Sequence, residues 1–160
     1  MVALPECSEQ IATLGDAQAY YRAKLVGAHK ITCHGRAVTI IFEAHATHLF
    51  SVEADDAAAL PEQDRVPNGR GGVRRFSVDR ARLMDRVLPA VSSYTVSVPG
   101  TGPRGREKRM LHGARLSSGM YLRVVLRPGP GDAFTCASAY PVTEAVWRAM
   151  MAAKRARFPP

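Results

Sequence analysis

The sequence predicts an α+β fold: a curved antiparallel β-sheet of about four to five strands, packed against N-terminal and central helices and followed by a C-terminal helix. Apolar residues recur at spacings of three and four in the first half of the chain and near its end, as in helices. Between Tyr94 and Tyr140 they alternate instead, as in strands. A chain of 160 residues can bury roughly 70% of its unfolded surface, so residues 1–160 are expected to form a single domain.

The N-terminal part of the chain predicts a helix and then a strand. Asp16 can cap a helix that runs to Leu25, and Gly27 stands where helices often end. Residues 36–43 are apolar on both of their alternating faces, which is typical of a strand that is covered on both sides.

A short helix, a long loop and a second helix are expected next. Residues 44–52 predict a short helix, because His45, His48 and Leu49 are three and four positions apart. Residues 53–75 are rich in Pro, Gly and charge, and their length predicts a flexible loop within the domain.

Ser77 can cap the second helix, which carries Asp79 in its first turn and which Pro89 should end or kink. Four strands follow, separated by Pro-Gly and Ser-Gly turns. They are predicted at 94–98, 108–112, 120–127 and 133–140. Thr143 can cap the last helix.

Charge is divided unevenly along the chain and favours a polyanionic partner. The net charge is +8, but residues 1–64 carry 4 basic and 9 acidic side chains, whereas residues 65–160 carry 18 basic and 5 acidic. Such an excess of positive charge indicates RNA or DNA as the partner, with an acidic membrane surface or an acidic protein as weaker alternatives. A solvated, arginine-rich surface with no ligand is the plainest alternative.

Localisation and redox state follow from the same composition. There is no apolar run close to 18 residues and no leader-like N-terminus, so we expect a cytoplasmic protein without membrane contact. Cys7, Cys33 and Cys136 are odd in number and widely spaced, which predicts reduced thiols.

Several kinds of chemistry lack their motifs. No Gly-rich phosphate loop leads into a helix with Lys-Ser or Lys-Thr, and no Gly-x-Ser-x-Gly elbow is present. The acidic residues of the basic half are scattered, which disfavours a two-metal nuclease. His45 and His48 are spaced like half of a metal site, but nothing nearby completes it. We therefore expect neither a metal nor a cofactor.

The candidate site combines a histidine, an arginine and a hydroxyl. His48 follows an apolar strand and can move protons near neutral pH, and His112 at a strand end is a second candidate acid or base. Strand alternation places Arg123 on one face of its strand; if Ser138 shares that face, a cation and a hydroxyl meet on a rigid platform. Alternatively, Arg123 simply faces solvent.

These groups suit RNA cleavage without a metal. RNA supplies its own nucleophile, the 2′-hydroxyl, so the protein needs a base, an acid and cations that stabilise the crowded phosphate. DNA lacks that hydroxyl and could be bound but not cut in this way.

Four groups of short motifs stand out in this sequence: Ile40-Ile41-Phe42 with Thr47-His48-Leu49-Phe50, Arg75-Phe76-Ser77-x-x-Arg80-Ala81, Tyr121-Leu122-Arg123-Val124-Val125 and Ser138-Ala139-Tyr140. Together they resemble the barnase, EndoU, colicin and RelE-like (BECR) nuclease superfamily, especially its phage-associated members. They span residues 36–141.

The resemblance implies which residues surround the substrate phosphate. His48, Arg123 and Ser138 are the implied catalytic residues, with Thr135 as the alternative hydroxyl and His45 as the alternative histidine. The expected substrate-binding neighbours, some of them suggested by position alone, are Arg74, Arg75, Arg109, His112, Tyr121 and Tyr140.

Three functions are therefore open at this point. The first is a metal-independent ribonuclease that acts as a toxin or phage-associated effector and is restrained by a cognate protein inhibitor. The second is a nucleic-acid-binding module without catalysis, and the third is a basic protein-interaction or inhibitor domain.

Overall fold

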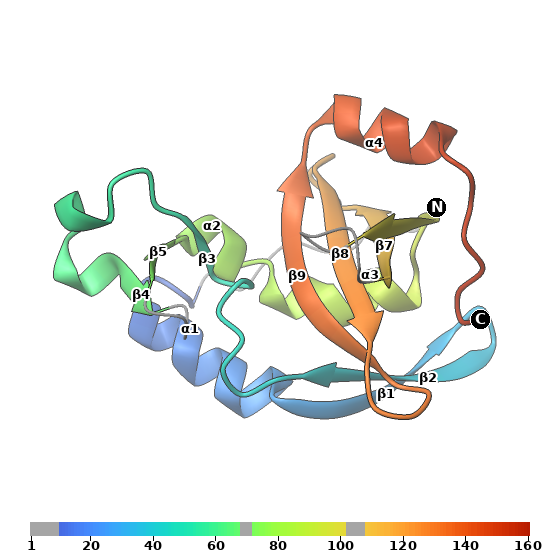
Figure 1. The fold of residues 1–160 in the computed structure, drawn as a ribbon, viewed down its shortest axis with the longest axis horizontal. Coiled ribbons are helices and arrows are strands. Elements are labelled where there is room, and N and C mark those ends of the chain that lie inside the picture. Colours follow the sequence, from blue (N-terminus) through green and yellow to red (C-terminus); the bar gives the residue numbers. More distant parts are fainter. Residues whose placement is uncertain (1–9, 68–71, 102–107) are drawn as a thin grey trace.

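The computed structural model describes residues 10–67, 72–101 and 108–160. A large curled sheet and a small sheet lie side by side, with helices around them (Figure 1). The strands of the large sheet are β1 (Gly27–Cys33), β2 (Arg36–Phe42), β6 (Val96–Thr101), β7 (Lys108–Arg115), β8 (Tyr121–Pro128) and β9 (Phe134–Val142). The strands of the small sheet are β3 (Ser51–Glu53), β4 (Arg65–Pro67) and β5 (Val73–Phe76). The α-helices are α1 (Leu14–Tyr20), α2 (Val78–Ala81), α3 (Val87–Ser92) and α4 (Glu144–Ala152).

The predicted α+β class is confirmed, but the sheet is larger than expected. It has six strands in the order β1-β2-β9-β8-β7-β6, and β2 and β9 run parallel while all other neighbours are antiparallel. The sequence missed β1 because its edge position leaves most of its side chains exposed, so no apolar alternation marks it. His34 and Gly35, with φ of 48° and 76°, form the two-residue turn that joins it to β2.

Helix α1 begins three residues earlier than predicted, because Thr13 rather than Asp16 is its N-cap. Asp16 completes a capping box by accepting from the Thr13 backbone N–H at 3.0 Å. The Ala12 N–H also donates to the Asp16 carboxylate, at 3.0 Å. This bond is the largest cause of the lowered pKa of Asp16, and the Thr13 bonds add to it. The helix continues as a π-turn over Tyr21–Leu25, and Gly27 follows with φ of 110°.

The predicted helix over residues 44–52 is wrong. The segment makes two separate turns, closed by hydrogen bonds from the Ala46 N–H to the Glu43 carbonyl and from the Phe50 N–H to the Thr47 carbonyl. No helix propagates between the turns, because three- and four-residue spacing supplies too little to overcome nucleation in so short a segment.

Residues 53–75, predicted as one flexible loop, contain β4, most of β5 and two short 3-10 turns, while the flexibility itself stays a prediction. Residues 68–71 of that prediction lie outside the described part of the chain. Strands of three and four residues escape a periodicity argument because they are too short to show alternation.

The predicted second helix begins as expected but is not continuous. Ser77 caps α2 by accepting from the Arg80 N–H at 3.3 Å, and a 3-10 turn over Met84–Arg86 then separates α2 from α3. Pro89 lies in the first turn of α3, where its missing N–H costs no hydrogen bond, so it neither ends nor kinks that helix.

The four alternating strands and the final helix are confirmed as β6 to β9 and α4. Thr143 caps α4, which lies across one end of the sheet (Figure 1). Gly113 allows this close approach, because a Cβ there would lie 2.8 Å from the Trp147 ring and 2.7 Å from Val96.

A bulge in the β8–β9 ladder decides which side chains share a face. Val125 pairs with Ser138, but Leu126 pairs with Cys136, so Ala137 is the extra residue. Cys136 therefore joins the core, whereas Ser138 and Tyr140 lie on the opposite face with Arg123. Regular alternation along residues 134–140 would have put Cys136 and Ser138 on one face, and the bulge separates them.

The core lies between the inner face of the curled sheet and the helices α1 and α3. It contains Val38, Ile40 and Phe42 of β2, Leu122, Val124 and Leu126 of β8, and Val87, Ala90 and Val91 of α3. Burial raises the pKa of the Cys33 thiol to about 11 and that of Cys136 to about 12, so both stay protonated and unreactive. Cys7 lies outside the described residues.

Candidate functional site

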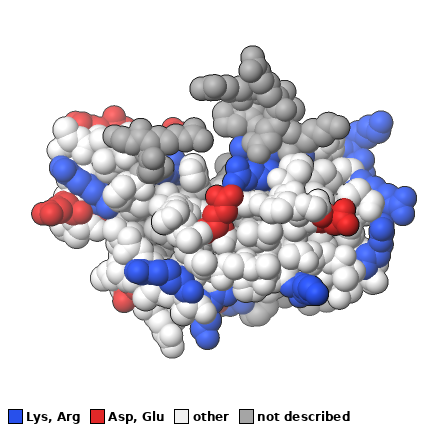
Figure 2. All heavy atoms as spheres, turned by 60° about the horizontal axis from the view of Figure 1, so that its bottom comes forward, with Lys and Arg blue, Asp and Glu red and all other residues white. Residues whose placement is uncertain are grey.

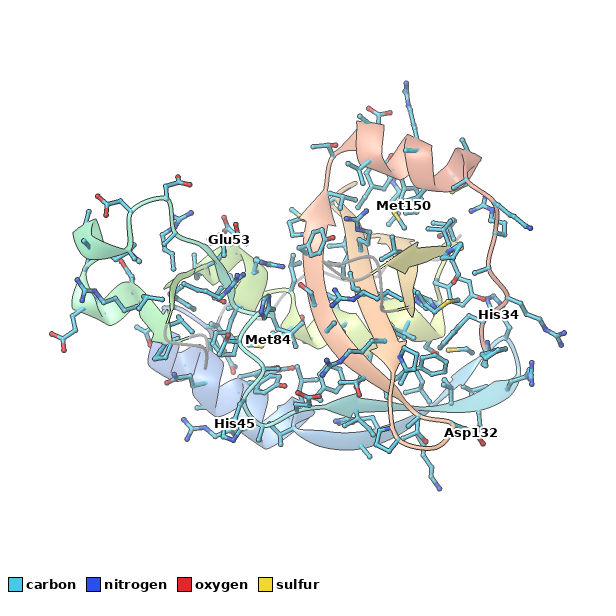
Figure 3. The ribbon with its side chains drawn as sticks, viewed as in Figure 1. His34, His45, Glu53, Met84, Asp132 and Met150 are labelled. Atoms are coloured by element: carbon cyan, nitrogen blue, oxygen red, sulfur yellow. The ribbon has the colours of Figure 1, made fainter. Side chains whose placement is uncertain are left out.

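A cleft of about 560 Å³ lies between the small sheet and the end of β9, with Glu53 at its rim (Figure 3). Four segments supply its walls: the turn after β2, strands β3 and β5, the start of α2, and the end of β9. The lining residues are His48, Val52, Glu53, Arg74, Ser77, Asp79, Arg80, Tyr140 and Pro141.

His48 lies in the second turn of the β2–β3 connection and is exposed to solvent. The protein packed around the ring is nevertheless enough to lower its pKa, first by desolvation and then through the charges of Arg74, Arg80 and Arg109; Glu53 opposes this effect. At neutral pH the imidazole is therefore predominantly neutral and can accept a proton.

Arg74 is 8% exposed and held by a single residue of the neighbouring strand. Its Nε donates to the Ser51 hydroxyl at 2.8 Å, and its Nη2 donates to the Ser51 carbonyl at 3.1 Å. Desolvation lowers the pKa of Arg74, and the Glu53 carboxylate opposes that effect without forming an ion pair. The guanidinium thus carries its charge in a partly desolvated position.

Arg80 bridges the two sheets. Its Nη1 donates to the Ser51 carbonyl at 2.6 Å, while its Nη2 donates to the Ser138 hydroxyl at 3.1 Å and to the Ala139 carbonyl at 3.2 Å. The Ser77 cap starts α2 three residues earlier, which is what turns Arg80 toward the cleft. Its Nε is buried and has no hydrogen-bond partner in the described part of the chain.

Tyr140 lies between two guanidinium groups. Arg80 and Arg123 approach its ring to 5.2 and 5.0 Å from the centroid. Arg123 also donates to the Tyr140 hydroxyl from Nε at 2.9 Å and from Nη2, because the two residues are direct cross-strand partners. The hydroxyl accepts both bonds, and within the described residues its own proton has no acceptor, so it remains available to a ligand.

The cleft has more buried positive charge than its own carboxylates neutralise. Among residues 10–67, 72–101 and 108–160, no carboxylate forms an ion pair with Arg74, Arg80 or Arg123. Glu53 and Asp79 are exposed at the rim. Partly buried cations without a paired anion favour binding of an anionic ligand, since a buried charge is stabilised by a partner.

Half of the predicted site residues come together here. His48, Arg74 and Tyr140 line the cleft; Ser138 contacts it through Arg80, and Arg123 contacts it through Tyr140. Ser138 and Arg123 therefore support the lining residues, whereas the sequence led us to expect both at the phosphate itself.

Four other predicted residues lie elsewhere. Arg75 is exposed, and alternation along β5 points it away from the Arg74 side. Arg109 lines a different cavity, near Arg36 and Phe134, although its charge still lowers the pKa of His48. Thr135 is 4% exposed, at the point where β9 pairs with β2. Tyr121 stacks on Trp147 beneath α4, with ring centroids 4.5 Å apart.

His112 is a core residue and cannot touch a substrate in this structure. It is 1% exposed and packs edge-on against Tyr94 and Phe158, at 4.9 and 4.3 Å between ring centroids. Burial lowers its pKa to about 4; the Met110 backbone opposes this weakly, although its geometry falls short of a hydrogen bond. His112 was predicted as an acid or base from its residue type and strand-end position, neither of which shows which face of β7 turns inward.

His45, the alternative histidine, lies apart from the cleft. It lines a second cavity with Tyr21 and Phe50 and sits well away from Glu53 (Figure 3). The two histidines of the same connection thus face different surroundings.

Sequence reasoning assigned no role to Arg80, Ser51, Glu53 or Asp79. Arg80 carried a usable signal, since a capping serine three residues earlier fixes its place in the first turn of a helix. Ser51 carried none, because its contacts all depend on tertiary structure.

On the face in Figure 2, Lys and Arg side chains gather along the right-hand edge, whereas elsewhere on this face they stand apart among Asp, Glu and uncharged residues. Within the described ranges no group of three His, Cys, Asp or Glu side chains could hold a metal ion. No helix there has the length and apolar character that a membrane crossing requires.

Comparison with protein families, with curated proteins and with solved structures gives no match for this chain. The function must therefore be inferred from the cleft itself.

Proposed function

We propose that this protein is a metal-independent ribonuclease that cleaves RNA by transesterification from the 2′-hydroxyl. One observation carries the proposal: a neutral, accessible histidine shares a cleft with two partly buried arginines that have no carboxylate ion-pair partner among the described residues. The RNA phosphodiester is an anion that a base, an acid and cations can cleave without a metal, because the 2′-hydroxyl is the nucleophile.

The reaction places each group in a definite role. His48 takes the proton of the 2′-hydroxyl as its oxygen bonds to phosphorus. The bond from phosphorus to the 5′-oxygen then breaks, leaving a 2′,3′-cyclic phosphate, and the 5′-oxygen takes a proton from an acid. Tyr140, which lines the same cleft, is the candidate acid, since its hydroxyl accepts from Arg123 and keeps its own proton to donate.

The arginines stabilise the negative charge that builds on the phosphate. Arg74 and Arg80 line the cleft, so a phosphate placed beside His48 lies close to both charges. Ser138 holds Arg80 at 3.1 Å and does not need to touch the phosphate. Preorganised charges of this kind contribute to catalysis because they need no rearrangement during the reaction.

A cleavage assay in excess chelator tests the proposal. A mixed RNA pool is incubated with the wild type, with His48→Ala and with Arg123→Ala; we expect cyclic-phosphate ends from the wild type and strong loss in both variants. His45→Ala is the matched control, because His45 lies on the same connection but lines another cavity. Equal activity in the wild type and both site variants would rule out this mechanism.

A nucleic-acid-binding module without catalysis is the second candidate. The hydrogen bonds of Arg80 favour this candidate. Both of its Nη groups already donate to oxygens of the protein, so Arg80 attracts a phosphate by its charge but has fewer donors left to stabilise a reacting phosphate. In that case the wild type retains RNA and DNA with a steep loss of affinity on adding salt, and no cleavage products form.

The resemblance to phage-associated nucleases extends the proposal to a toxin or effector held in check by a protein inhibitor. Growth arrest on expression, relieved by His48→Ala, is the expected result. Growth arrest that persists in this variant would show that the toxicity does not depend on His48 in the cleft.

A further inference from the structure

We propose that Ser51 is a positioning residue that holds Arg74 and Arg80 at fixed places relative to His48. The effect of this positioning on catalysis rests on the proposed ribonuclease function, whereas its effect on the pKa of His48 does not.

Ser51 is buried and forms hydrogen bonds through both its hydroxyl and its carbonyl. It is 0% exposed, and its hydroxyl donates to the Thr47 carbonyl at 2.7 Å while accepting from Arg74 Nε at 2.8 Å. Its carbonyl accepts from Arg74 Nη2 at 3.1 Å and from Arg80 Nη1 at 2.6 Å. One donor and both carbonyl lone pairs are therefore engaged by three other segments.

Those segments are the ones that carry the functional groups. Thr47 immediately precedes His48, Arg74 belongs to β5, and Arg80 belongs to α2, which in turn contacts β9 through Ser138. A single buried serine thus ties the turn of the candidate base to both cations. None of these contacts reaches a ligand directly, so Ser51 acts through the residues it holds.

The hydroxyl matters more than the carbonyl for this role. Any residue at position 51 would offer the carbonyl, but only a hydroxyl can receive Arg74 Nε and at the same time donate to Thr47. Removing it leaves the buried Arg74 Nε without its partner and leaves the Thr47 carbonyl with only the Phe50 N–H. Hydrogen bonds to charged groups are among the stronger ones in proteins.

The expected electrostatic effect has a definite sign. Arg74, Arg80 and Arg109 lower the pKa of His48, Glu53 raises it, and Asp79 and Tyr140 line the same cleft. If the Ser51 hydroxyl no longer holds Arg74, the guanidinium moves away from the His48 ring and lowers the pKa of His48 less. The pKa of His48 should then rise toward its ordinary value of 6.5.

The test titrates the His48 ring by NMR in the protein without RNA. We expect Ser51→Ala to raise the His48 pKa, and Ser51→Thr, which keeps the hydroxyl, to restore the wild-type value. Ser92→Ala is the matched control, because the Ser92 hydroxyl also donates to a carbonyl at 2.7 Å, that of Thr32, far along the chain from the cleft.

Arg74→Lys provides a second route if Ser51→Ala does not fold. It keeps the positive charge but lacks the Nε donor, so it should raise the His48 pKa in the same direction. Combined with Ser51→Ala where that variant folds, it should add little further change, because both remove the same contact.

Activity gives a separate readout. In the chelated RNA assay we expect Ser51→Ala to lower kcat about tenfold with a smaller change in KM, as for loss of one hydrogen bond to a charged group. The lower, acidic limb of the pH–rate profile should move to higher pH with the His48 pKa.

The outcomes separate the two proposals. An unchanged His48 pKa in folded Ser51→Ala and Arg74→Lys overturns the role of Ser51, whatever the wild type does to RNA. A raised pKa with a wild type that cuts no RNA supports Ser51 as the positioning residue and rejects the ribonuclease.

Discussion

His48 and His112 are the two histidines that the sequence nominated for proton transfer, and their surroundings differ in nearly every respect. Desolvation is the main cause of the lowered pKa in both. His48 is exposed in a cleft, where arginines add to the effect. His112 is enclosed by the rings of Tyr94 and Phe158, and both of its nitrogens lack hydrogen-bond partners among the described residues.

The contrast shows that a lowered histidine pKa does not by itself mark a functional site. Burial among rings keeps His112 neutral at a cost to stability and with no access for a ligand. Desolvation, strengthened by the charges of neighbouring arginines, lowers the pKa of His48 while the side chain stays in contact with solvent, which is the arrangement a general base requires. Access and the identity of the neighbours separate the two cases.

The largest expected effect is the loss of RNA cleavage in a His48 variant, compared with a variant of His112. His48→Gln should reduce RNA cleavage by about 10²–10⁴-fold, the usual contribution of a general base, with little change in thermal stability because the side chain is exposed. His112→Leu should leave kcat nearly unchanged. Rates and melting curves of both variants provide the measurement; a strong loss of activity in His112→Leu with its fold intact would contradict the contrast.

The pH dependence of stability should belong to His112. Its folded pKa of about 4 lies below the ordinary value of 6.5, so the unfolded chain binds the proton first. The contribution is therefore fully present above pH 6.5 and is lost as the pH falls toward 4, amounting to about 3 kcal/mol.

Denaturant unfolding of the wild type and of His112→Leu, at several pH values between 7 and 4, measures this effect. The variant should lose the part of the pH dependence that comes from His112. An identical pH dependence in both proteins would show that the buried ring is not responsible.

A moderate effect is expected for Tyr140→Phe. The ring stays between Arg80 and Arg123, so packing is retained, but the hydroxyl that receives two donors from Arg123 is lost. Cleavage should fall about 10- to 100-fold, within the range for a proton donor or a strong hydrogen bond. Tyr121→Phe is the matched control, since Tyr121 lies under α4; equal losses in both variants would remove Tyr140 from the mechanism.

The smallest effect should appear in the salt dependence of binding. His48→Ala is used as the background so that RNA is not consumed, and Arg74→Ala should reduce the slope of log affinity against log salt by about 0.7, as for one phosphate contact on a single strand. Arg75→Ala is the neighbouring control on the other face of β5. An unchanged slope in Arg74→Ala would place the phosphate away from this arginine.

Much of the fold was predictable because it depends on local periodicity. The strands β6 to β9 alternate over six to nine residues, and the caps Ser77 and Thr143 lie directly before their helices. Failures occurred where local signals are weak: at the exposed edge strand β1, and in the strands of three and four residues between positions 51 and 76.

The site was predictable only in part, for a related reason. His48 was found from its residue type and its place after an apolar strand, and Tyr140 from a short motif. The bulge at Ala137 could not be foreseen, yet it decides that Ser138 faces Arg80 while Cys136 enters the core. A one-residue shift in pairing reverses every face assignment beyond it.

The sequence by itself determined the α+β class, the positive charge of residues 65–160, and a small set of candidate residues that included His48, Arg123 and Ser138. Tertiary structure alone decided which of them meet. Arg80 and Arg74 converge on Ser51 from separate segments, and His112 turns inward although the sequence offered it, like His48, as a candidate acid or base. The physical reason is that local periodicity depends on near neighbours, whereas a site depends on long-range register and packing.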